Sequence, residues 1–113
     1  MKFLSRDEIF KADDLPYKDV DVHEWGGKVR IRSLRGVDRS KLIEMSSKEL
    51  DASDWIERMI IACTCDESGE PLFDIKDLDR LKKKNAKVLN RLFQIADDLN
   101  LISERSRDNL KGE

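Results

Sequence analysis

Hydrophobic residues recur at helical spacing along most of the chain, and the first such stretch lies at its N-terminus. Ser5 is placed to cap a helix, and Glu8, three residues later, completes a capping box. Leu4 before the cap and Ile9 after it can form a hydrophobic staple. These signals predict a helix over residues 5–13.

Strand-like alternation is found in one stretch, residues 18–34, and predicts a β-hairpin. Gly26 and Gly27 are the turn signal, because both central residues of a type I′ turn have positive φ. Counting outward from these glycines places Asp21 opposite Arg32 and gathers the apolar side chains on one face, as in a sheet with one buried side. That face would hold Val20, Val22, Val29 and Ile31.

Helical periodicity returns over residues 37–102. Asp38 is the expected cap of the first helix in this part, and Asp74 is the expected cap of a short later one. The most apolar segment, DASDWIERMIIACT, is predicted to be the central helix, and NAKVLNRLFQIADDLN the last strong one. The last helix is predicted to carry one apolar stripe, made of Val88, Leu89, Leu92, Phe93, Ala96 and Leu99. Residues 103–113 offer only Leu110 for burial, so we expect them to fray. The buried face of the central helix is predicted to hold Trp55, Ile56, Met59, Ile60 and Cys63.

Together these elements predict a single α+β domain over residues 1–113, mainly α, in which a small antiparallel hairpin packs on four to five short helices. Charged residues make up 41% of the chain and aromatic residues 6%, which alone would suggest disorder, but the periodic apolar positions favour a folded domain with a charged surface. The formal net charge of −2 gives no global argument for nucleic-acid binding. No stretch approaches the roughly 18 apolar residues of a membrane span, and the N-terminus lacks a signal-peptide pattern.

Few residues of the chain belong to the types that usually carry catalysis or bind metals. His23 is the only histidine, and no catalytic motif accompanies it, so we interpret it as a surface residue of the hairpin. Cys63 and Cys65 are too close for the usual zinc spacing and lack two further ligands, so we expect free thiols, buried or half-buried, in a reducing cytoplasm. The segment from Thr64 to Ile75 has the length of a calcium-binding loop with Gly69 at its sixth position. Its first and last positions need oxygen ligands such as carboxylates, but Thr64 and Ile75 occupy them, so we expect no calcium site. The sequence therefore predicts no enzyme, no metal site and no cofactor.

A series of basic residues, Arg80, Lys84, Lys87 and Arg91, has the spacing of one face of a continuous helix. We interpret this series as a solvated face or as a docking surface for an acidic protein partner. The alternative is a small nucleic-acid-binding accessory protein that uses the same four residues. Aromatic residues do not interleave with these cations, and neighbouring aspartates dilute their charge, which makes nucleic acid the weaker hypothesis.

Two ordered segments resemble a known protein family. The stretch VDVHEWGGKVRIRSLRGVDR is similar to a block shared by tail assembly chaperones of long-tailed bacteriophages and prophages, and DESGEPLFDIKDLDRLKKKNAKVLNRLFQIADDLNLI is similar to a later block of that family. The opening LSRDEIFKADDL is also similar to the start of such proteins, so the resemblance covers most of the chain in consistent order. The matching positions are Trp25, Gly26, Gly27, Arg32 and Gly36 in the first block, and Asp66, Gly69, Phe73, Leu92 and Asn100 in the second.

The resemblance implies a non-catalytic assembly factor of the host cytoplasm that is absent from the mature virion. Such chaperones bind the tail tape-measure protein, keep it soluble and recruit tail-tube subunits, and many also exist in a longer form made by ribosomal frameshifting. The family brings no catalytic residue to this chain, and it leaves the oligomeric state open. We expect partner contacts at Trp25, Arg32, Arg80, Lys84, Lys87 and Arg91.

A helical domain of this kind can mask an apolar client by helix-in-groove packing. Trp25, predicted to lie at the hairpin tip beside the Lys28 side chain, is the first expected contact. Met45 and Met59 would line the groove if they are exposed, although ordinary core positions are the better interpretation of both.

Overall fold

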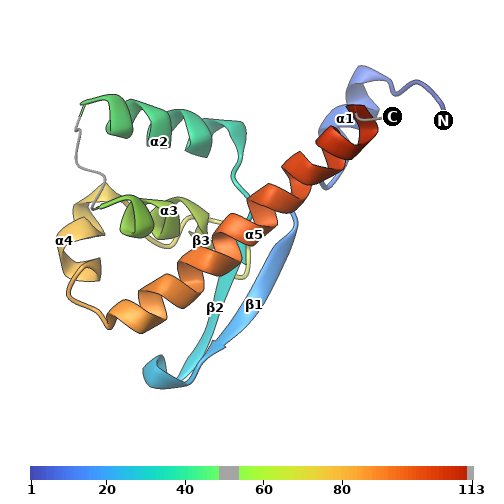
Figure 1. Cartoon of the computed structure of the whole chain (residues 1–113). Helices are drawn as coiled ribbons and strands as arrows, with labels where there is room; N and C mark the ends of the chain where they lie inside the picture. The colour runs from blue at the N-terminus through green and yellow to red at the C-terminus, as the bar shows by residue number, and fades with distance from the viewer. Residues whose placement is uncertain (49–53, 112–113) are drawn as a thin grey trace.

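A computed structural model describes the backbone of residues 1–48 and 54–111 and, within these ranges, the side chains of residues 1–44 and 54–100. A three-stranded antiparallel sheet in the order β1-β2-β3 lies against helices, so the predicted α+β class, mainly α, is confirmed (Figure 1). The α-helices are α1 (Arg6–Lys11), α2 (Gly36–Lys48), α3 (Trp55–Cys63), α4 (Leu78–Leu81) and α5 (Ala86–Lys111). The strands are β1 (Tyr17–Val22), β2 (Gly27–Arg32) and β3 (Thr64–Cys65). The 3-10 helices η1 (His23–Trp25) and η3 (Ile75–Asp77) also lie within the described ranges.

The core forms where α3 and α5 pack on each other and on β1 and β2. The apolar stripe predicted for the last helix is confirmed, with Val88, Leu92 and Ala96 fully buried in α5. Ile60 and Cys63 are likewise fully buried in α3. The predicted burial of Trp55 is wrong, because this residue begins α3, is 41% exposed and lines a small hollow.

The hairpin keeps its predicted faces but not its predicted register. Val20 pairs with Val29 and Asp21 pairs with Lys28, so Asp21 does not face Arg32. The pairing differs from the predicted one by an even number of residues. Because side chains alternate with a period of two, the even shift leaves the buried side chains of Val20 and Val22 on the inner face.

The turn explains the shifted register. Three residues, His23 to Trp25, form the 3-10 helix η1, and Gly26 closes it with φ of 77° and an N–H that donates to the Val22 carbonyl over 3.0 Å. Gly27 already begins β2, where it pairs with Val22. The turn therefore uses one left-handed glycine instead of two, and Trp25 packs against the core rather than beside Lys28.

The third strand, β3, was not predicted. It has only two residues, Thr64 and Cys65, which pair with Ile31 and Arg30 of β2. Two residues are too few to show a strand alternation, and here they continue directly from the apolar run of α3.

The predicted helix caps have different outcomes. The capping box of α1 is confirmed, with the Ser5 hydroxyl accepting from the Glu8 N–H, although α1 ends at Lys11 and buries no residue. The predicted cap at Asp74 is confirmed as well, and it forms a capping box with Asp77 at the start of η3. The predicted N-cap at Asp38 is wrong, because α2 begins at Gly36 and Asp38 lies inside its first turn.

The last helix extends further than the sequence predicts. α5 continues to Lys111 instead of ending near residue 102, and residues 112 and 113 lie outside the described ranges. Over the described part of the chain, no helix has the length and apolar composition that crossing a membrane requires.

Both cysteines are free and buried, as predicted, at 0% exposure for Cys63 and 3% for Cys65. Burial raises the pKa of the Cys63 thiol to about 12 and also raises the pKa of the Cys65 thiol. A buried thiol that keeps its proton is a poor nucleophile.

We expect both thiols to resist alkylation in the folded protein at pH 8 and to react fully once guanidinium unfolds it, because only unfolding exposes and deprotonates them. Timed labelling with iodoacetamide followed by mass spectrometry measures this. A Ser68→Cys variant, whose new thiol lies on an exposed turn, is the positive control and should react within the native protein. Rapid native labelling of Cys63 would contradict the buried placement.

Candidate functional site: a groove between two helices

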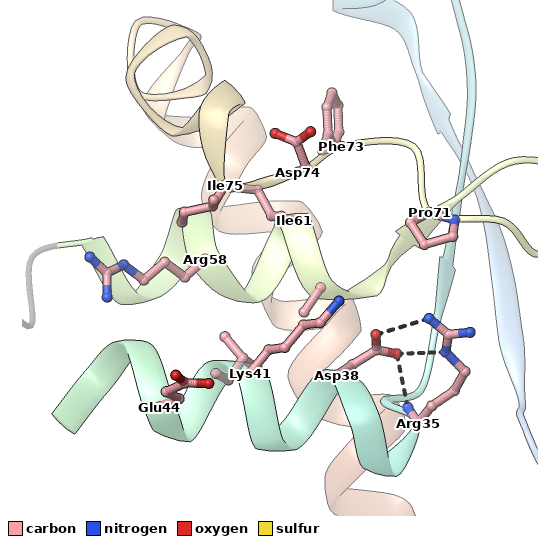
Figure 2. A pocket seen from close by; sticks show the side chains of 12 residues that line it. Arg35, Asp38, Lys41, Glu44, Arg58, Ile61, Pro71, Phe73, Asp74 and Ile75 are labelled. Atoms are coloured by element: carbon pink, nitrogen blue, oxygen red, sulfur yellow. Dashed lines mark hydrogen bonds and ion pairs between the residues drawn. The ribbon is translucent and has the colours of Figure 1, made fainter. Parts of the chain in front are cut away.

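A groove of about 550 Å³ lies between α2, α3 and the segment 71–75. Figure 2 shows α2 and α3 running side by side, with the segment from Pro71 to Ile75 along the opposite edge of α3. Apolar side chains line the groove: Leu42, Ile61, Ala62, Pro71, Phe73 and Ile75. Charged side chains of both signs also line it: Arg35, Asp38, Lys41, Glu44, Arg58 and Asp74.

The groove stays open because α2 packs on the rest of the fold mainly through α3. Leu42 is the buried apolar anchor in the described part of α2, at 2% exposure, whereas Val37 and Ile43 are half or more exposed. A second hollow of about 250 Å³ lies between α2, α3 and α5, and Leu42 lines this hollow too. Helix α2 is therefore flanked by a hollow on each side.

The other wall is fixed by backbone hydrogen bonds and a cap. The Leu72 N–H donates to the Thr64 carbonyl over 3.2 Å, and Pro71 forms a bridge with Cys65. The Asp74 side chain accepts from the Lys76 N–H over 2.7 Å, which starts η3. This wall is thus tied to β3 at one end and to a capped helix at the other.

The N-terminal end of α2 is held by a shared carboxylate. Asp38 accepts hydrogen bonds from the Arg35 side chain at 3.0 and 3.1 Å, and from the Arg32 Nη1 at 3.3 Å. It also accepts from the Arg35 backbone N–H at 3.2 Å (Figure 2). Burial acts most strongly on the pKa of Asp38 and would raise it, but the hydrogen bonds from Arg35 and the charges of both arginines together lower it. The Asp38 carboxylate is thus kept ionised in a mostly buried position.

The basic series does not form the predicted helical stripe. Helix α4 ends at Leu81 and α5 begins at Ala86, so Arg80 and Arg91 lie on different helices. Asn85 causes the break, because its side chain accepts from the Lys87 and Val88 N–H groups and caps α5. The continuous helix assumed for these four residues is wrong.

The break nevertheless gathers several of the predicted partner residues at the hairpin tip. The Lys84 Nζ lies 5.7 Å from the centre of the half-buried Trp25 ring. Arg91 forms a two-bond ion pair with Glu24 at 2.8 and 3.3 Å. Lys87 is exposed one helical turn before Arg91.

Two other predicted residues have different surroundings. Arg32 is only 4% exposed and pairs with Asp38, so its guanidinium lies in the interior. Met59 is buried, as the core interpretation expected, and the side chain of Met45 lies outside the described ranges. Partner contacts at the six expected residues stay predictions.

The groove itself was missed by sequence reasoning, which named only the two methionines as candidate liners. Its walls come from three segments far apart in the chain, and no local pattern marks such a juxtaposition. The available signal was the charge around the start of α2, where Arg35 just before the helix and Asp38 in its first turn are three residues apart.

No protein-family model matches the chain, and no curated protein sequence matches it. Among solved structures, the fold is similar to the structure of bacteriophage HK97 tail assembly chaperone, with a TM-score of 0.56 and 26% sequence identity. The match covers 82% of this chain and 90% of that one. The resemblance to phage tail assembly chaperones is thereby confirmed in the fold.

Residues that match the sequence motifs of tail assembly chaperones mostly hold this fold together. Gly69 has φ of 86° in the turn after β3, and Leu92 is fully buried. The Asn100 side chain accepts from the Leu34 N–H over 3.0 Å and donates to the Ala96 carbonyl over 2.8 Å, which ties α5 to the link between β2 and α2. Gly69, Leu92 and Asn100 do not line the groove, whereas Phe73, which also matches a motif position, does line it.

Replacing Asp38 by Ala should lower the free energy of unfolding by about 3–5 kcal/mol, because it leaves Arg32 buried without its carboxylate. Urea unfolding followed by circular dichroism measures the loss. Arg39→Ala, an exposed change on the same helix, should stay within about 0.5 kcal/mol of the parent.

The same ion pair has a predicted pH dependence. Since the folded-state pKa of Asp38 lies below its ordinary value of 3.8, the stabilisation is present above that pH and is lost as the pH falls through the folded-state pKa. The difference in stability between parent and Asp38→Ala should therefore shrink only under strongly acidic conditions. A constant difference down to full acid unfolding would argue against this role of the carboxylate.

Proposed function

We propose that this protein is a chaperone of phage tail assembly that binds an apolar helical segment of the tail tape-measure protein in the groove between α2 and α3. The observation that carries the proposal is this groove, open and lined by apolar and charged side chains, in a fold similar to the bacteriophage HK97 tail assembly chaperone. The proposed role is binding and release, which needs no catalytic group and no cofactor.

The chemistry of the groove suits an amphipathic helix. Ile61, Ala62 and Phe73 offer an apolar surface to the buried face of such a helix, while Lys41 and Glu44 offer both signs of charge to its polar edges. Binding of this kind depends on apolar anchor residues of the client at helical spacing, and the client residues between these anchors can vary. A long client with many similar segments can therefore be bound at several places by several copies.

Binding by many weak contacts fits the solubilising role. Several copies along one extended client gain effective concentration from their common scaffold, so no single site has to bind tightly. Charged residues make up 41% of the chain. A surface rich in charged side chains keeps a complex with an apolar client in solution. We further propose that these copies recruit tail-tube subunits in the host cytoplasm and leave before the virion is complete.

The groove can be tested with one pair of matched variants. Ile75 lines the groove and Leu72 does not, yet both are exposed apolar residues of the same segment, at 46% and 52%. Ile75→Asp should abolish co-purification with the tape-measure protein and return that protein to the insoluble fraction, whereas Leu72→Asp should leave both unchanged. Co-expression, affinity purification and light-scattering mass give solubility and stoichiometry together.

Melting temperatures of both variants control for loss of fold. Aspartate is favoured in the first turn of a helix, where position 75 lies, so Ile75→Asp is expected to fold. If the tape-measure protein stays insoluble with the parent chain, the proposed client is wrong. If Ile75→Asp and Leu72→Asp reduce binding equally, the groove is not the binding site.

A further inference from the structure

A second surface lies at the hairpin tip, where η1 meets the turn between α4 and the start of α5. Figure 1 shows this tip on the opposite side of the molecule from α2. Two contacts join it to the helices: the Glu24–Arg91 ion pair at 2.8 Å and the placement of the Lys84 Nζ 5.7 Å from the centre of the Trp25 ring. None of these residues lines the groove between α2 and α3.

The charges at this end do not cancel. The Glu24 carboxylate is engaged by Arg91, whose hydrogen bonds lower the Glu24 pKa, and Lys82 is paired with Asp54 at 2.6 Å. Lys83, Lys84 and Lys87 form no ion pair with any described residue, and all three are exposed. The structure thus leaves Lys83, Lys84 and Lys87 beside Glu24, whose charge is already neutralised by Arg91.

Trp25 gives this group an apolar centre. Its ring packs on the core with one part and stays half-exposed with the other, beside Lys84. A cation near an aromatic ring is held there by the ring's quadrupole, which keeps the lysine over the indole instead of extending into water. Tryptophan is also enriched in the energetically important part of protein interfaces.

We infer that this end, made of Trp25, Lys83, Lys84 and Lys87, is a docking surface for an acidic segment of a protein partner that also carries an apolar side chain. The carboxylates of the segment would pair with the lysines, and its apolar side chain would cover the exposed part of the indole. The complementary charge supplies the specificity and the association rate. The inference does not depend on the groove or on its client.

An acidic protein segment fits these observations better than nucleic acid. The break at Asn85 places Lys83 and Lys84 in a turn and Lys87 at the start of α5, so the cations do not follow one helix as a track along a phosphate backbone would. One half-buried indole gives one stacking position, whereas binding of single strands uses successive aromatic platforms. With the whole chain at a net charge of −2, the attraction of a long polyanion is also weak outside this cluster.

The chain carries its own reporter for the test. It has two tryptophans, so a Trp55→Phe background leaves Trp25 as the single tryptophan. Polyglutamate is titrated into the full-length protein at low salt and at roughly 0.15 M salt while Trp25 fluorescence is recorded, and an oligothymidylate of equal charge is the second probe.

We expect a saturable change of Trp25 fluorescence with polyglutamate, weakened at least about tenfold by Lys84→Glu combined with Lys87→Glu. The matched control, Lys18→Glu combined with Lys76→Glu, makes the same charge change at exposed positions elsewhere and should bind as the parent does. Circular dichroism melting shows that both double variants are folded.

Three results would overturn the inference: no change of Trp25 fluorescence, equal weakening by both double variants, or tighter binding of oligothymidylate than of polyglutamate at roughly 0.15 M salt. The last result would instead assign the cluster to nucleic acid. Because the Lys84/Lys87 double variant leaves the groove intact, it should still solubilise the tape-measure protein, so failure here and failure of the proposed function are separately visible.

Discussion

The carboxylate of Asp38 joins the sheet to the helix that forms one wall of the groove. Arg32 reaches it from the end of β2, and Arg35 reaches it from the residue before α2. On the other side of the same link, Asn100 of α5 holds the Leu34 backbone. The direction in which α2 leaves the sheet is therefore set by one ionised acid and one amide. Without these contacts, α2 would depend on Leu42 alone within its described part.

This arrangement separates the requirements of folding from those of binding. The core between α3, α5 and the sheet contains residues such as Ile60, Val88 and Leu92, none of which a partner could reach. The groove lies between α2 and α3 and the basic end lies at the hairpin tip, and Figure 1 shows α2 and that tip on opposite sides of the molecule. A chaperone with two surfaces that share no residue can contact two partners at once.

Local signals predicted local structure. The caps at Ser5 and Asp74 follow from side chains that bond to backbone groups within three residues, so the sequence is enough to find them. The stripe of α5 follows from the helical repeat. Asn85 is an equally local signal, and the predicted last helix begins there. The helical face inferred from the spacing of Arg80, Lys84, Lys87 and Arg91 disregarded this start.

Features that depend on distant segments could not be predicted in the same way. Whether Gly26 and Gly27 both form the turn depends on where Trp25 packs, and that is decided by α5 and the core. The strand β3 exists because β2 offers it an edge, not because of its own two residues. The groove likewise forms where three segments distant in the chain pack together, and no local sequence pattern predicts that packing.

The even offset of the hairpin pairing has a consequence for how such proteins can diverge. Side chains of a strand alternate between faces, so inserting or deleting two residues in β1 changes the pairing partners but returns each apolar side chain to the inner face. A change of one residue would instead turn Val20 and Val22 toward water and bring Asp19 or Asp21 into the core. Length variation at this tip is therefore tolerated in steps of two, and descendants of this fold can remodel the outer end of the hairpin without rebuilding the helices beneath it.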